Sequence, residues 1–233
     1  MVRLLHIDSS ARPGRSGEHA HGSHTRRLSA RFVRQWQALR PGDAVVHRDL
    51  ALSPPSPVGG DWVHAAFTAP ARREPWMHAA LAESDVLVDE LSAADLIVVG
   101  VPMYNFGMPS TLKAWIDNIV RVGRTFGFDR SRKGEPYWPL LAGHGKRLVL
   151  LSSRGDHGYD PGGRLCADNH VERGVETPMR YIGIDAVERI AIEYDEFADE
   201  RLHASIAAAE AEVDALVARL VAQTQRMSGL RRA

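Results

Sequence analysis

The sequence has little cysteine, no excess of charge and no long apolar run, and each shortage excludes a class of protein. Cys166 is the only cysteine in 233 residues, which excludes a disulfide framework and any zinc or iron–sulfur site built from several thiolates. Because 29 Lys and Arg residues balance 29 Asp and Glu residues, no overall basic charge is present to hold a nucleic acid. No apolar stretch approaches the ~18 residues of a membrane span, and Asp8 interrupts the N-terminal segment before a signal-peptide core forms. We therefore expect a cytoplasmic protein that binds neither nucleic acid nor membrane.

Five short apolar runs predict the strands of one sheet, at 2–7, 45–50, 95–100, 147–152 and 186–194. Runs without polar alternation are typical of strands that are buried on both faces. Apolar residues at helical spacing alternate with them, at 28–39, 75–93 (one helix or a pair), 109–120, 167–181 and 197–221. This alternation predicts an α/β fold, a doubly wound five-stranded parallel sheet with helices on both faces, and five strands favour the order 2-1-3-4-5. Because no linker or repeat interrupts the pattern, we expect one domain over 1–225 and a frayed tail over 226–233.

In a sheet of this order, ligands bind beyond the carboxyl ends of the strands, next to the point where the strand order reverses. Ser9 and Ser10 follow the first strand, and Ser23, His24 and Thr25 stand just before the first helix. Hydroxyls and free N–H groups at a helix N-terminus favour an anion such as phosphate. Ser and Thr are favoured there as simple helix caps with no ligand at all, and taken alone this segment favours a cap over an anion site. Neither a Gly-x-Gly-x-x-Gly motif nor a phosphate-loop lysine follows this strand.

Two further polar segments follow the third and fourth strands. Met103-Tyr104-Asn105-Phe106 combines apolar side chains and an amide, which suits a flat heteroaromatic ligand with a polar edge. Ser153-Arg154-Gly155-Asp156 forms a turn in which Gly155 would allow a ring to approach the backbone closely. Arg154 and Asp156 are also consistent with a solvated surface pair.

With these segments in place, the sequence resembles the FMN-dependent NADH:azoreductases, relatives of the NAD(P)H:quinone oxidoreductases. The residues that carry the resemblance are Ser9-Ser10, Pro102 to Phe106, Ser153-Arg154-Gly155, Arg48-Asp49-Leu50, and Leu112-Lys113 with Asp117. The resemblance implies a flavodoxin-like homodimer that binds FMN. Ser9, Ser23, His24 and Thr25 would hold the phosphate, Met103 to Phe106 would lie along the isoalloxazine ring, and Ser153 to Asp156 would contact its pyrimidine side.

The implied activity is transfer of a hydride from NADH or NADPH, through flavin N5, to a quinone or an azo compound by ping-pong kinetics. The cofactor carries the electrons, so no side chain is expected to be an essential acid or base. The chain departs from the family pattern at His24, where an amide is usual, and at Gly155-Asp156, where Gly-Gly is usual. A negative charge at Asp156 would lower the potential of a nearby flavin.

Two other functions remain open on sequence grounds: a flavodoxin-like electron carrier, and a flavin-binding redox sensor without efficient turnover. Flavodoxins lean acidic, whereas this chain is neutral. His19, His21 and His24 lie close together, but histidines in a glycine-rich loop are commonly solvated, and we predict no metal site. We also predict that Cys166 is a free, non-catalytic thiol. Large aromatic residues favour interfaces, and the candidates here are Trp62, Trp76 and Trp138.

Overall fold

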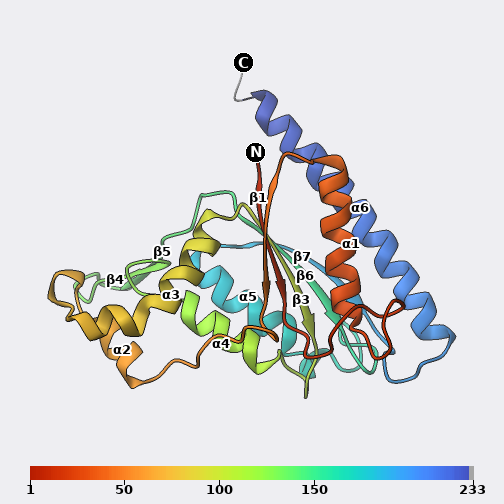
Figure 1. Cartoon of the computed structure of the whole chain (residues 1–233), viewed down its shortest axis with the longest axis horizontal. Coiled ribbons are helices and arrows are strands. Elements are labelled where there is room, and N and C mark those ends of the chain that lie inside the picture. Colours follow the sequence, from red (N-terminus) through yellow and green to blue (C-terminus); the bar gives the residue numbers. More distant parts are fainter. Residues whose placement is uncertain (231–233) are drawn as a thin grey trace.

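The computed structural model describes the backbone of residues 1–230 and the side chains of residues 1–225. A parallel sheet forms its centre, with strands in the order β2-β1-β3-β6-β7, and helices lie on both sides of it (Figure 1). The predicted fold and strand order are therefore confirmed. The five strands are β1 (Arg3–Asp8), β2 (Ala44–Asp49), β3 (Leu96–Pro102), β6 (Arg147–Ser153) and β7 (Ala186–Ile192).

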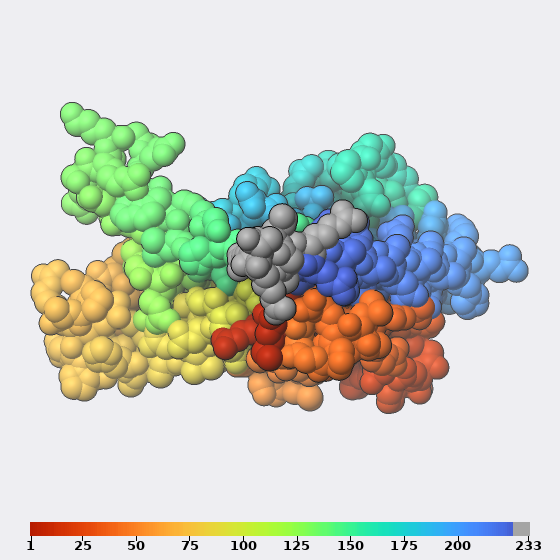
Figure 2. All heavy atoms as spheres, turned by 90° about the horizontal axis from the view of Figure 1, so that it is seen from above, coloured from red at the N-terminus to blue at the C-terminus, as the bar shows by residue number. Residues whose placement is uncertain are grey.

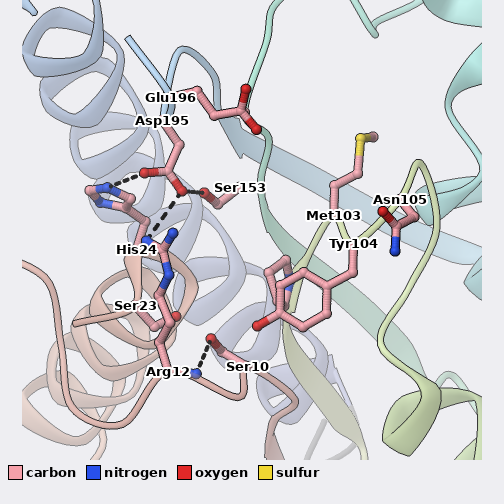
Figure 3. A pocket seen from close by; sticks show the side chains of 12 residues that line it. Ser10, Arg12, Ser23, His24, Met103, Tyr104, Asn105, Ser153, Asp195 and Glu196 are labelled. Carbon is pink, nitrogen blue, oxygen red and sulfur yellow. Dashed lines mark hydrogen bonds and ion pairs between the residues drawn. The ribbon is translucent and has the colours of Figure 1, made fainter. Parts of the chain in front are cut away.

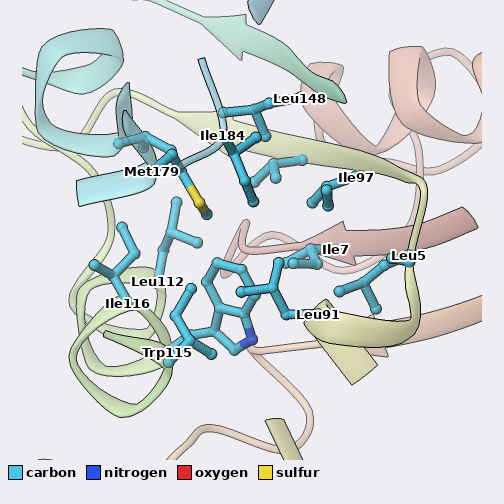
Figure 4. Close-up of a cluster of buried hydrophobic side chains, with 14 of the residues drawn as sticks. Leu5, Ile7, Leu91, Ile97, Leu112, Trp115, Ile116, Leu148, Met179 and Ile184 are labelled. Carbon is cyan, nitrogen blue, oxygen red and sulfur yellow. The ribbon is translucent and has the colours of Figure 1, made fainter. Parts of the chain in front are cut away.

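One face of the sheet is covered by α3 (Pro75–Ala93), α4 (Ser110–Ile119) and α5 (Val171–Ile182). Apolar residues of these helices recur every three or four positions and pack on alternate side chains of the strands. Figure 4 shows Trp115 of α4 at the middle of this core, between Met179 of α5 and Ile7 of β1. A fully buried large apolar side chain stabilises the fold by about 1.5–3 kcal/mol, so this core fixes the strand ends firmly.

The other face is covered by α1 (His24–Leu39) and α6 (Glu200–Leu230), which lie side by side (Figure 1). Phe32 and Trp36 of α1 are buried against the sheet and α6. Three ion pairs join the helices in the described residues: Arg27 Nε lies 2.7 Å from Glu210 Oε1, and Arg31 lies 2.7 Å from Asp214 Oδ2 and 3.5 Å from Glu210 Oε2. The two ends of the sequence therefore build a single layer.

Two insertions lie away from the sheet. The first forms α2 (Gly60–Phe67) and the short 3-10 helix η1 (Pro70–Arg72), and it packs on α3 through Ala65 and Ala66. The second forms a hairpin of β4 (Phe126–Phe128) and β5 (Tyr137–Pro139), and the segment around its turn projects from the body (Figure 2). Trp138 is packed over Gly127, where a Cβ would lie 2.0 Å from the indole.

Most predicted elements are found with shifted ends. The segment 75–93 is a single helix, α3, whereas the sequence left a helix pair open. The segment 167–181 begins with a 3-10 turn, η2 (Cys166–Asp168), and its α-helix runs over Val171–Ile182 with Pro178 inside. The α2 helix was not predicted. The tail predicted over 226–233 overlaps the end of α6, which reaches Leu230, and 231–233 lie outside the described residues.

No helix in the described part of the chain is long and apolar enough to cross a membrane. Of the predicted interface residues, Trp76 is 39% exposed, whereas Trp62 is partly buried against Ala65 and Ala66 of α2. An interface role for the tryptophans stays a prediction.

Candidate functional site

A cavity of about 300 Å³ lies at the carboxyl edge of the sheet, beyond β1, β3, β6 and β7. This volume is at the lower end of the range for small-molecule pockets. Figure 3 shows side chains from four segments of the chain pointing into it. Its lining residues are Ser10, Arg12, Ser23, His24, Pro102, Met103, Tyr104, Asn105, Ser153, Gly155, Asp195 and Glu196.

The N-terminus of α1 forms one wall of the cavity. Ser23 caps the helix, because its hydroxyl accepts a hydrogen bond from the backbone N–H of Arg26 at 3.2 Å. No acidic residue lies in the first turn of α1, so the positive end of the helix dipole is not neutralised from within the helix. Gly100 of β3 lets this end approach the sheet, since a Cβ there would lie 3.2 Å from the carbonyl oxygen of Thr25. The wall therefore presents backbone and hydroxyl donors, which suit an anionic group.

Arg26 ties the loop after β1 to the end of β2. Its guanidinium donates to the Asp49 carboxylate, with one N–O distance of 2.8 Å, and to the backbone carbonyls of Ser10 and Arg12. Burial acts to raise the pKa of Asp49, but the hydrogen bonds and charge of Arg26 outweigh it and hold that pKa below its ordinary value. The ionised pair thus holds Ser10 and Arg12 at the cavity.

The segment after β3 makes a tight turn at Tyr104–Gly107. Tyr104 and Gly107 exchange backbone hydrogen bonds of 2.8 and 3.0 Å, and both central residues have positive φ, 48° for Asn105 and 67° for Phe106. Two positive φ angles are typical of a primed hairpin turn, where Asn is tolerated but Phe is strained. Tyr104 fixes the turn to the loop after β1, because its hydroxyl accepts a hydrogen bond from the backbone N–H of Ala11 at 3.1 Å.

At the end of β6 and in the residues after it, successive side chains point to opposite sides, as they do in an extended chain. Ser153 and Gly155 line the cavity. The Arg154 side chain is 2% exposed and points away, toward Glu172 at 2.6 Å, Asp160 at 2.8 Å and Glu193 at 3.1 Å. The Asp156 carboxylate is paired with Arg164 at 2.5 Å, so a cation already balances its charge.

The segment between β7 and α6 supplies two carboxylates that the sequence did not point to, Asp195 and Glu196. Asp195 Oδ1 lies 3.2 Å from Nε2 of His24, and its Oδ2 lies 3.6 Å from Arg12 and accepts a 3.4 Å hydrogen bond from Ser153 (Figure 3). Burial acts to raise the pKa of Asp195, but the hydrogen bond and charge of His24 and the charge of Arg12 outweigh it, so the pKa is lowered. The Glu196 carboxylate covers Gly155, where a Cβ would lie 2.5 Å from Oε1.

The structure brings together most of the residues predicted from the sequence. Those that line the cavity are Ser23, His24, Met103, Tyr104, Asn105, Ser153 and Gly155. Ser9 and Thr25 are buried beside it: the Ser9 hydroxyl donates to the carbonyl of Gly100 at 2.8 Å, and the Thr25 and Ser23 hydroxyls lie 2.9 Å apart. Phe106 is 51% exposed in the adjacent turn. The lining residues that were not assigned as cofactor contacts are Ser10 and Pro102, which the sequence analysis names beside the site, and Arg12, Asp195 and Glu196, which it does not name.

Comparisons with known proteins agree with this architecture. Residues 2–217 match a family model described as a flavodoxin-like fold. The chain is 41% identical over 224 residues to FMN-dependent NADH:quinone oxidoreductase 2 of Idiomarina loihiensis, with 96% of this chain and 92% of the relative covered. It is 42% identical over 197 residues to FMN-dependent NAD(P)H:quinone oxidoreductase 1 of Pseudomonas aeruginosa, with 84% of this chain and 89% of the relative covered. The crystal structure of an azoreductase from Bacillus anthracis has the same fold, with a TM-score of 0.80 at 24% identity over 93% of this chain and 99% of that one.

Proposed function

We propose, from the premise that this chain belongs to the flavodoxin-like fold family, that it is an FMN-dependent NAD(P)H:quinone oxidoreductase that also accepts azo compounds. The names of its relatives support the quinone reductase activity. The observation that carries the proposal is the cavity itself, where the N-terminus of α1 faces the Met103–Asn105 segment at the carboxyl edge of the sheet. One side of the cavity suits a phosphate and the other suits a flat ring.

The residues present fit FMN. The N-terminus of α1, whose first turn holds no acidic residue, would hold the phosphate together with the hydroxyls of Ser10 and Ser23 and the guanidinium of Arg12. Met103, Tyr104 and Asn105 would hold the ring, with apolar surface along its face and an amide at its polar edge. The negative charge of Asp195 beside this site is offset by Arg12 and by the hydrogen bond with His24. Ser9 and Thr25 would act as supports, because their hydroxyls already bond within the protein.

When bound, FMN supplies the redox chemistry, taking a hydride from NADH or NADPH and passing it to the acceptor. The residues of the cavity position the ring and exclude water from it. One cavity that admits donor and acceptor in turn predicts ping-pong kinetics, and no lining side chain is needed as an acid or a base. The proposal includes a cytoplasmic location and a homodimer. Sedimentation of the purified protein would test the homodimer.

The first experiment is an absorption spectrum of the purified protein after FMN is added and unbound flavin is removed. We expect retained flavin, bleaching under anaerobic NADH or NADPH, and recovery of colour when a benzoquinone is added. Failure to retain flavin would overturn the cofactor assignment. Retained flavin that neither nicotinamide reduces would favour an electron carrier or a sensor.

A pair of arginine variants makes the test specific for this cavity. Arg12→Ala should weaken FMN binding on the order of tenfold, the effect of one lost contact to a charged phosphate. Arg164→Ala removes the same charge from an equally exposed side chain outside the cavity, where Arg164 pairs with Asp156, and should leave FMN binding unchanged. Equal affinities for the two variants would contradict the proposed phosphate position.

A further inference from the structure

Two histidines and an aspartate form a cluster on the face of the sheet that α1 covers. His6 and Asp8 are two residues apart on β1, so they point to the same face. His47 lies directly opposite His6 on the edge strand β2. The two imidazole rings stack with centroids 4.4 Å apart, and one ligand atom from each of the three side chains lies within 4.8 Å of the others.

The buried histidine of the cluster has an unused ring nitrogen. The His6 side chain is 9% exposed, and its Nε2 has no hydrogen-bond partner among the described residues. This atom faces Asp8 Oδ2 at 3.4 Å. A buried polar atom without a hydrogen bond is destabilising, and binding of a ligand at that atom would remove the penalty.

The distances within the cluster match the donor spacing around a tetrahedral metal ion. Zinc binds imidazole nitrogen and carboxylate oxygen at about 2.0–2.1 Å, which separates neighbouring tetrahedral ligands by about 3.3 Å. Nε2 of His6 lies 3.4 Å from Asp8 Oδ2, and Nε2 of His47 lies 3.0 Å from the same oxygen. The His47 side chain is 49% exposed, so it can turn slightly to admit an ion from solvent and leave a fourth position for water.

Asp8 Oδ2 is hydrogen-bonded to His47 Nε2 at 3.0 Å, and a bound ion would replace this hydrogen bond with two metal–ligand bonds. Asp8 Oδ1 accepts a 2.7 Å hydrogen bond from Ser29, which orients the carboxylate and leaves Oδ2 facing the histidines. Arg26 is the nearby cation, with Nη1 3.6 Å from Asp8 Oδ2, beyond hydrogen-bonding distance. Because Arg26 is paired with Asp49, its charge is already balanced.

We propose that His6, Asp8 and His47 form a binding site for a divalent first-row transition metal, with zinc as the best match. Two imidazoles and one carboxylate are a donor set that suits zinc rather than magnesium or calcium. None of the three residues lines the cofactor cavity, so the site is separate from the proposed function. A bound ion would join β1 to the edge strand β2.

The test measures zinc binding to tag-free, metal-stripped full-length protein by titration calorimetry, with the thermal midpoint as a second readout. We expect one equivalent of zinc and a higher midpoint in its presence. His47→Gln removes an exposed ligand, while its amide can still donate to Asp8, so the fold should survive. The variant should lose the equivalent of zinc and the thermal shift.

Two control variants separate this cluster from other histidines. His144→Ala replaces a histidine far from the cluster in the sequence and should bind zinc as the wild type does. His19→Ala/His21→Ala removes the histidines of the loop after β1 and should also keep the full equivalent. The proposal is overturned if the wild type binds no zinc, if His47→Gln binds it unchanged, or if the loop variant abolishes binding.

Discussion

Replacing Arg154 tests whether this residue supports the fold or binds the cofactor. Its guanidinium is the charge partner of Glu172, which is buried with its side chain 7% exposed. Arg154→Met keeps much of the side-chain volume and removes the ion-pair partner of Glu172, while the 2.8 Å hydrogen bond from Ser152 remains. We therefore expect a large loss of stability.

The magnitude follows from burial. Breaking a buried ion pair by removing one partner costs about 3–5 kcal/mol, because the remaining charge stays buried without compensation. The Arg154 and Glu172 side chains are 2% and 7% exposed, so solvent screens this pair little. Asp160, with its side chain 66% exposed, adds little to the estimate. Arg154→Met/Glu172→Gln should regain most of the loss, since Glu172 no longer places a charge in the core and Glu193 keeps its hydrogen bonds from the backbone N–H groups of Gly158 and Tyr159.

The dependence on pH gives an independent check of sign. Burial acts to raise the pKa of Glu172, but the charge and hydrogen bond of Arg154 outweigh it, so the pKa lies below its ordinary value of 4.5. Glu172 therefore contributes stability above about pH 4.5 in the wild type, and that stability is lost as the pH falls through the lowered pKa. In Arg154→Met burial is opposed by hydrogen bonds alone and no longer by a charge, so the pKa of Glu172 should rise, and lowering the pH from 7 should relieve part of the destabilisation.

Urea unfolding at several pH values, followed by circular dichroism, measures both effects. Arg164→Met is the matched control, since it breaks the solvent-screened pair with Asp156 and should change the stability little. A cost below about 1 kcal/mol for Arg154→Met would refute the reasoning. A stable Arg154→Met protein that has lost FMN binding would instead assign the side chain to the cofactor.

Three further predictions concern the walls of the cavity. Phe106→Gly should raise the free energy of unfolding by about 1 kcal/mol, because a φ of 67° strains a residue that has a Cβ. A free energy of unfolding below that of the wild type, measured with urea, would contradict this. Gly22 precedes the cap residue Ser23, and a Cβ on it would lie 2.3 Å from the backbone of Arg15, so Gly22→Ala should lower the free energy of unfolding by about 1–3 kcal/mol and weaken FMN binding. Gly42→Ala is the control, because nothing lies within 4 Å of its Cβ, and it should have neither effect. Asp195 should stabilise the protein above about pH 3.8 and lose this effect as the pH falls through its lowered pKa. His24→Gln should move that pKa upward, and a carboxyl titration by NMR that stays unchanged would argue against the contact.

The parallel sheet was predictable because its central strands are buried on both faces. Leu96–Pro102 and Arg147–Ser153 need apolar residues at nearly every position, and the sequence shows this without a structure. The α2 helix, Gly60–Phe67, was not predictable in the same way. It is short and buries only Ala65 and Ala66, so its sequence carries little helical periodicity.

The location of the cavity was predictable from topology, but the direction of each side chain was not. Strands that run in parallel end at one edge, which places the segments after β1, β3 and β6 together. Within Ser153–Asp156, alternate residues face opposite sides, and position in a turn does not tell which. Asp195 follows the fifth strand at the same edge, and applying the topological rule to that strand would have pointed to it.

The layer formed by α1 and α6 has a consequence for synthesis of the chain. Arg27 and Arg31 find their partners 183 residues later, at Glu210 and Asp214. While a ribosome makes the intervening residues, the apolar stripe of Phe32 and Trp36 has no α6 to cover it. Contacts of such long sequence separation form late and slowly, and exposed apolar surface invites aggregation or chaperone binding until they do. The nascent protein is therefore most vulnerable along its first helix, until its last helix leaves the ribosome.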